Sequence, residues 1–212
     1  MSRPIVVLAI MLLALTGPVF GQVDATSDTG SLVSQITFGS SNDWFPTVSS
    51  DGKWIVFESD RDSRGEHQGH DLWRFEISSG ILTRITSNQS VHMHDQSPSG
   101  RRVVFDSHPV GLTIVDVDDP AEVQELVPGG RPVWSPRGDT IFFDARVDPE
   151  QKSHELREID LDSGEIRTVF HSTSGYVTPT VSPDGRVIVY SMGPWGERDL
   201  WTISVDGSGM EQ

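Results

Sequence analysis

Short runs of β-branched and aromatic residues recur along the chain, and polar turn residues separate them. WIVFES at 54–59 and VIVYS at 187–191 are examples in which apolar residues occupy consecutive positions. Such runs are typical of strands that are buried on both faces between neighbouring sheets. No helical period follows residue 21. The pattern therefore predicts an all-β protein built from antiparallel strands.

The runs belong to a unit that occurs four times, as FPTVSSDGKWIVFES, MHDQSPSGRRVVFDS, RPVWSPRGDTIFFDA and TPTVSPDGRVIVYSM. Each copy contains a turn like SPDG at 182–185, in which proline fixes one φ and glycine accepts a positive φ. We call the turn glycines the anchor glycines; they are Gly52, Gly100, Gly138 and Gly185.

Further strands are predicted after each turn, and these complete one small sheet per copy. The second strands are expected at 71–77, 112–117, 155–161 and 199–205, and third strands at 82–86, 123–127 and 166–170. Sequential small sheets predict a β-propeller of four repeats, with a β-sandwich as the alternative. The expected domain covers 33–212, with blades at about 39–86, 87–127, 128–170 and 171–212.

The ends of the repeat array leave two interpretations open. The fourth copy lacks the outer strand that the other copies have, whereas 33–38 (VSQITF) is an outer strand with no copy of its own. Residues 33–38 could complete the fourth sheet and remove an exposed edge. Alternatively, the four repeats are part of a longer propeller.

The amino-terminal segment predicts export. Arg3 precedes the apolar run at 5–15, and compact residues follow Pro18, which together indicate a signal peptide over 1–21 and a linker over 22–32. Eleven apolar residues are too few for the alternative, an uncleaved membrane-spanning helix. The sequence has no cysteine, which excludes disulfides and lipid attachment at a cysteine. We expect a periplasmic or secreted protein.

The repeat is similar to the WD40-like PD40 repeat of the TolB family of periplasmic propellers. The P-x-V/W-S-P-D-G turn, the I-V-F-x-S strand and the D-L-W strand carry the resemblance, which covers residues 34–212. TolB proteins have an amino-terminal α/β domain and six blades. We expect this chain to lack that domain, because only about a dozen residues separate the expected signal peptide from the first repeat strand, and its sequence contains four copies. Similar repeats occur in prolyl-oligopeptidase-like enzymes and oligogalacturonate lyases, so the resemblance implies a fold more than an activity.

Net charge limits the partners. A formal charge of −15 repels nucleic acids and anionic lipid surfaces, so neither is expected as a partner. In a propeller, the loops that lead into the innermost strands converge at the mouth of the central channel, and we expect the binding site there. Six residues before each anchor glycine, three copies have proline and the second has His94.

A metal site would need convergent ligands from several blades, and only the second copy offers histidine. His92 and His94, at i and i+2, could share one strand face, but the equivalent positions of the other three copies carry no metal ligands. We therefore expect no metal, cofactor or catalytic residue. The sequence instead predicts a non-enzymatic scaffold for a protein or peptide. The alternatives are a propeller that binds or degrades polysaccharide, and a fragment of a larger enzyme. The expected contact residues are Asp43, Trp44, His92, His94, Asp95, Arg131 and Tyr176.

Overall fold

The computed structural model describes residues 34–62, 69–87, 89–148, 150, 153–194 and 196–209. The expected signal peptide and linker lie outside the described residues. The chain divides into two compact units, 1–38 and 39–212. The second unit contains all four repeats.

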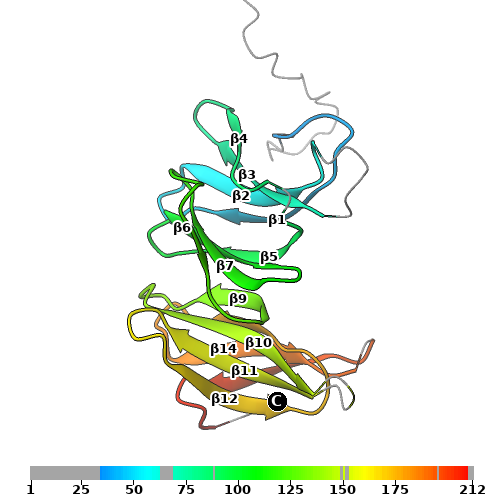
Figure 1. Cartoon of the computed structure of the whole chain (residues 1–212), viewed down its shortest axis with the longest axis vertical. Helices are drawn as coiled ribbons and strands as arrows, with labels where there is room; N and C mark the ends of the chain where they lie inside the picture. The colour runs from blue at the N-terminus through cyan, green and yellow to red at the C-terminus, as the bar shows by residue number, and fades with distance from the viewer. Residues whose placement is uncertain are drawn as a thin grey trace, which may run out of the picture. The chain divides into compact units, whose positions relative to one another are not determined.

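The repeats form four antiparallel sheets that succeed one another along the chain, coloured from blue to red in Figure 1. The described residues contain strands and no helix. The first three sheets have four strands each and the fourth has three. The strands are β1 (Asp43–Val48), β2 (Trp54–Ser59), β3 (Asp71–Glu76), β4 (Leu82–Arg84), β5 (Val91–Gln96), β6 (Arg102–Ser107), β7 (Gly111–Asp116), β8 (Val123–Glu125), β9 (Gly130–Trp134), β10 (Thr140–Asp148), β11 (Ser153–Asp160), β12 (Ile166–Ser172), β13 (Thr178–Val181), β14 (Val187–Met192) and β15 (Asp199–Ser204).

Each sheet begins with the hairpin that the repeat predicts. The anchor glycines have φ between +69° and +75°, the left-handed region that glycine enters without steric cost. In each turn the glycine N–H donates to the serine carbonyl three residues earlier, as in Gly185 N to Ser182 O at 2.8 Å. The four-repeat β-propeller prediction is confirmed.

In the first three repeats the strands after the turns are buried on both faces, as predicted, because each blade packs against the next. In the fourth repeat this prediction was wrong, because buried residues of β14 alternate with partly or fully exposed ones. One apolar cluster joins Val56 and Leu72 of the first blade to Val103 and Phe105 of the second. Similar clusters join the second blade to the third and the third to the fourth. The joints between blades are therefore the hydrophobic core of the protein.

The structure differs from the sequence-based expectation just before each turn. We expected loops that lead into the innermost strands, but these segments are themselves the first strands, β1, β5, β9 and β13. These four are the innermost strands, because each contacts the first strand of the neighbouring blade.

Over the described residues, the fourth sheet has the order β13-β14-β15. Residues 34–38 belong to the other compact unit and contain no strand.

Candidate functional site

The innermost strands carry a β-bulge whose extra residue has a positive φ. Phe45, Met93 and Arg131 occupy the same place in the first three repeats, and their φ values are 49°, 44° and 53°. The pairing with the next strand shifts register at this point in each of these three sheets. Left-handed backbone at a non-glycine residue is costly and persists only where surrounding contacts enforce it. Bulges of this kind re-aim the neighbouring side chains.

The bulge at Met93 gives the two histidines of VHMHDQ different environments. In a regular strand, residues i and i+2 point to the same face. Here His92 pairs with Asp106 and His94 with Phe105, so Met93 is the extra residue. His92 is exposed, whereas the side chain of His94 has no exposed surface. The pair therefore does not form a shared two-histidine site.

Facing the bulges is a column of acidic residues six positions after the anchor glycines. It holds Glu58, Asp106 and Asp144, with Ser191 in the fourth repeat. Each of the two aspartates contacts the innermost strand region of the next blade: Asp106 accepts the N–H of Arg131 at 3.0 Å, and Asp144 that of Val177 at 2.8 Å. These carboxylates connect consecutive blades.

The first joint is different, because Glu58 contacts a side chain. Glu58 Oε1 lies 3.1 Å from His94 Nδ1, and the other ring nitrogen of His94 lies 3.3 Å from the hydroxyl of Thr47. His70 lies close by, with Nδ1 3.6 Å from Glu58 Oε2 and its ring stacked on Trp44. His94 thus has a structural role between blades one and two.

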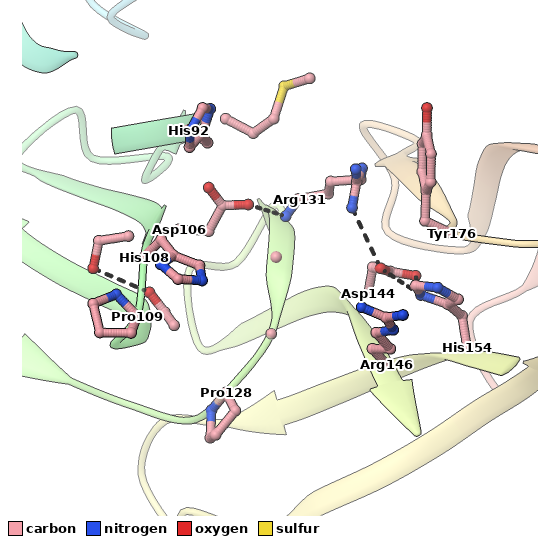
Figure 2. A pocket seen from close by; sticks show the side chains of 15 residues that line it. His92, Asp106, His108, Pro109, Pro128, Arg131, Asp144, Arg146, His154 and Tyr176 are labelled. Carbon is pink, nitrogen blue, oxygen red and sulfur yellow. Dashed lines mark hydrogen bonds and ion pairs between the residues drawn. The ribbon is translucent and has the colours of Figure 1, made fainter. Parts of the chain in front are cut away.

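A pocket of about 670 Å³ opens beside the second and third bulges (Figure 2). Its walls come from strands β5, β6, β9 and β10 and from the loops that follow β6 and precede β9. His154 of β11 and Tyr176, which precedes β13, complete the lining. The charged and aromatic residues of the lining are His92, Asp106, His108, Arg131, Asp144, Arg146, His154 and Tyr176.

Arg131 and Tyr176 form one wall of this pocket. The guanidinium of Arg131 lies over the Tyr176 ring at 3.7 Å from its centroid, and that of Arg198 lies 4.0 Å from the same centroid. Arg198 also donates to the carbonyl of Tyr176 at 2.8 Å. Two cation–π contacts on one ring hold the aromatic side chain in a defined orientation.

Asp144 lies at the base of the pocket between the imidazole of His154 and the guanidinium of Arg131. His154 Nδ1 lies 2.9 Å from Asp144 Oδ2, and Arg131 Nη1 donates to the same oxygen at 3.4 Å (Figure 2). Burial raises the pKa of Asp144, although the N–H of Val177 and the charges of His154 and Arg131 oppose this change. The carboxyl group of Asp144 is therefore engaged by two side chains of the pocket lining.

Asp106 lies at the other side of the same pocket. Burial raises the pKa of this carboxyl to about 6, against the opposing effects of the Arg131 N–H and of His92. Its approach to the next blade depends on Gly130, because a Cβ at that position would lie 2.7 Å from Asp106 Oδ2. Asp106 can therefore change charge near neutral pH.

The structure brings three of the seven expected contact residues, His92, Arg131 and Tyr176, into the pocket. Asp43 pairs with Arg61 at 2.7 Å in the first blade, and Trp44 stacks on His70 there. Asp95 is partly buried and accepts the N–H of Trp134 at 2.8 Å; like buried His94, it bridges blades.

Sequence reasoning missed Asp106, His108, Asp144, Arg146 and His154. The two aspartates could have been found, because the acidic column is visible once the repeats are aligned on the anchor glycines. His108 and Arg146 share one repeat position, eight residues after the anchor glycine, where the first and fourth copies have Asp60 and Gly193. The residue type at this position varies between copies, so its role could not be predicted from the repeat.

Among the described residues, no group of three or more histidine, aspartate or glutamate side chains could hold a metal ion. No helix over the same ranges is long and apolar enough to cross a membrane.

Comparison with solved structures places these four sheets among known propellers. A protein described as a TolB from Agrobacterium tumefaciens superposes with a TM-score of 0.64 at 21% identity, over 79% of this chain and 60% of that one. TolB from Acinetobacter baumannii gives 0.65 at 16% identity, over 83% and 44%. The chain has a TolB-like β-propeller fold. An oligogalacturonate lyase from Vibrio parahaemolyticus is also similar, with a TM-score of 0.59 at 18% identity over 78% and 50%.

No protein-family model matches the sequence of this TolB-like chain. An uncharacterized protein of Agrobacterium fabrum is 31% identical over 158 residues, which are 67% of this chain and 52% of that protein. The chain thus spans about half the length of this curated relative. At the identities of the solved structures, the similarity establishes the fold and leaves activity open.

Proposed function

We propose that this chain is an exported, non-enzymatic β-propeller that binds a segment of a protein or peptide partner in the pocket beside Arg131 and Tyr176. One observation carries the proposal: a cavity of about 670 Å³ at the innermost strands, bounded by an aromatic ring fixed between two guanidinium groups. Cavities of this size are typical of ligand sites. Tyrosine and arginine are among the residue types that most often dominate the energy of protein interfaces.

The interactions within the pocket favour binding over catalysis. Asp144 is engaged by His154 and Arg131, and Asp106 by the backbone of Arg131. These contacts orient the lining and link the blades, which is the arrangement expected of a rigid recognition surface.

Export is part of the proposal, and it rests on the sequence of 1–21 and on the fold shared with TolB proteins. Fractionation of the native host would test it. The proposal requires the chain in the periplasmic or extracellular fraction, shortened by about the length of the leader.

The binding role is tested by affinity capture from an envelope extract of the native host. An Arg131→Gln, Tyr176→Ala double variant should lose the proteins that the unaltered chain retains. Arg137→Gln is the matched control, because the Arg137 side chain is 86% exposed in a turn outside the pocket. Identical captured proteins from all three chains would refute the proposal.

A polysaccharide-binding role is the second candidate. The two arginines and three histidines of the pocket also suit an acidic sugar, and an oligogalacturonate lyase has a similar fold. Retention of the chain on a pectate matrix, lost in Arg131→Gln, would favour this role over peptide binding.

A further inference from the structure

The residues that join neighbouring blades recur from copy to copy. Leu72, Leu112 and Leu156 occupy one position of the repeat, and each is completely buried in the apolar cluster between its own blade and the next. Leu200 occupies this position in blade four and is 70% exposed. Leu200 is therefore a joint residue on which no described blade packs.

The central strand of blade four shows the same difference. Four residues after their anchor glycines, Val56, Val104 and Phe142 are buried in these clusters, whereas Val189 is partly exposed. Val189 pairs with β13 on one side and with β15 on the other, so its exposure does not come from a sheet edge. The sheet face itself is open.

Over strands β13, β14 and β15, this open face carries no charged side chain. Because paired residues of antiparallel strands lie on the same face, the register identifies its members. We call them the outward face of blade four; they are Thr178, Thr180, Val187, Val189, Ser191, Leu200, Thr202 and Ser204. The whole sequence has 31 acidic residues and 16 lysines and arginines, so a charge-free sheet face departs from its general composition. Depletion of charge is typical of the centre of a protein–protein interface.

Blade one has the complementary face. At the joint between the first two blades, the side of blade two that contacts blade one contributes Val103, Phe105, Val115 and Val117. The equivalent residues of blade one form what we call its receiving face: Ile55, Phe57, Phe75 and Ile77. The first three belong to an apolar cluster in which every described member comes from blade one, and Ile77 is 47% exposed although Val117 is buried. The receiving face thus has the residue types of a joint.

No apolar cluster of the described residues joins blade four to blade one. The outward face and the receiving face are therefore both left unmatched by the described blades. We propose that a second copy of the chain covers the outward face of blade four with its own receiving face, so that the contact repeats the joint formed three times within each chain. Such a contact is head to tail, because two different surfaces meet. The inference goes beyond the proposed function, since it concerns neither the pocket nor its ligand.

Size-exclusion chromatography with light scattering, applied to the complete chain over a range of concentrations, tests the contact. The unaltered chain should have a mass that is a multiple of the single-chain mass. Leu200→Asp should weaken association about a hundredfold, because it buries an unpaired carboxylate. Leu200→Ser, which removes apolar area without adding a charge, should weaken it about tenfold. Val123→Asp is the matched control and should leave association unchanged, because Val123 is 48% exposed on outer strand β8 and belongs to neither face.

A mixture of two variants tests the head-to-tail geometry. Ile77→Asp alters the receiving face and leaves the outward face intact, whereas Leu200→Asp does the reverse. At concentrations where the unaltered chain associates, each variant alone should be a single chain, but an equal mixture should form pairs through the two intact faces. Circular dichroism spectra like that of the unaltered chain show that the variants are folded.

Three results would each overturn the inference: a single-chain mass for the unaltered chain at every concentration, undiminished association of Leu200→Asp, or a mixture that does not pair. None of them changes the partner capture expected at the pocket, so the proposed function is tested separately.

Discussion

His94 of the second blade lies 3.1 Å from Glu58 of the first, and both side chains are completely buried. The other three repeats have proline at the position of His94, and aspartate or serine at that of Glu58. The two residues that depart from the repeat, Glu58 and His94, therefore contact each other between the first and second blades. Glu58, which is one methylene longer than aspartate, contacts the side-chain nitrogen of His94. At the equivalent position of the next two blades, Asp106 and Asp144 accept a backbone N–H instead.

This joint predicts a large stability cost for His94→Ala. The variant leaves the buried carboxylate of Glu58 without its histidine partner, which should lower the free energy of unfolding by about 2 to 4 kcal/mol. His171→Ala is the control, because that histidine also contacts a glutamate, but its side chain is 71% exposed. Urea unfolding measures both variants. Equal, small effects would show that the buried pair is not a structural joint.

Gly130 should be required for the contact between Asp106 and the third blade. Gly130→Ala places a Cβ 2.7 Å from Asp106 Oδ2 and should cost about 1 to 3 kcal/mol in urea unfolding. In an Asp106→Ala background the crowding disappears, so the same substitution should cost much less. If the cost is the same in both backgrounds, it does not arise from this contact.

Asp106→Asn should stabilise the protein in a pH-dependent way. The native pKa of Asp106, about 6, exceeds its ordinary value of 3.8, so its ionised form is disfavoured in the fold. The stability that the protonated carboxyl of Asp106 contributes is fully present below pH 3.8 and is lost as the pH rises through 6. We expect Asp106→Asn to be about 1 to 2 kcal/mol more stable at pH 8, after allowance for solvent screening.

The gain from Asp106→Asn should disappear by pH 4, where Asp106 itself is largely neutral. Asp184→Asn provides the opposite case, because hydrogen bonds from Ser182 and Arg186 lower the pKa of this exposed aspartate. It should give no gain at pH 8. Thermal unfolding at pH 4, 6 and 8 measures both variants, and a gain at pH 8 that persists at pH 4 would rule out ionisation of Asp106 as its cause.

The fold could be predicted from the sequence because its determinants are local and repeated. Glycine at each anchor turn and β-branched residues in each following strand indicate hairpins four times over. The bulge could not be predicted in this way. Phe45, Met93 and Arg131 have no shared chemistry, so no residue type indicates the positive φ that all three adopt. The expected loops were wrong because the segments are strands. The possible shared face of His92 and His94 does not form because the bulge at Met93 separates them.

The pocket was predictable only in part. The repeat register pointed to Arg131 and Tyr176, and the structure places both at the pocket. The acidic column is visible in the aligned repeats, but its role depends on the contacts of Asp106 and Asp144 with the next blade, which the sequence does not show. His154 lies opposite Arg146 in the pairing of β10 with β11, one position before the second strand expected at 155–161, so its place beside the pocket was not foreseen.

Site-specific photo-crosslinking in the native host tests the central claim most directly. A photoreactive benzoylphenylalanine would replace His108, an exposed residue of the pocket, and in a separate strain Val123, which is 48% exposed on outer strand β8. We predict a discrete protein adduct from position 108 that disappears with Arg131→Gln and does not form from position 123. The same adducts from both positions, or none from position 108, would contradict partner binding at this pocket.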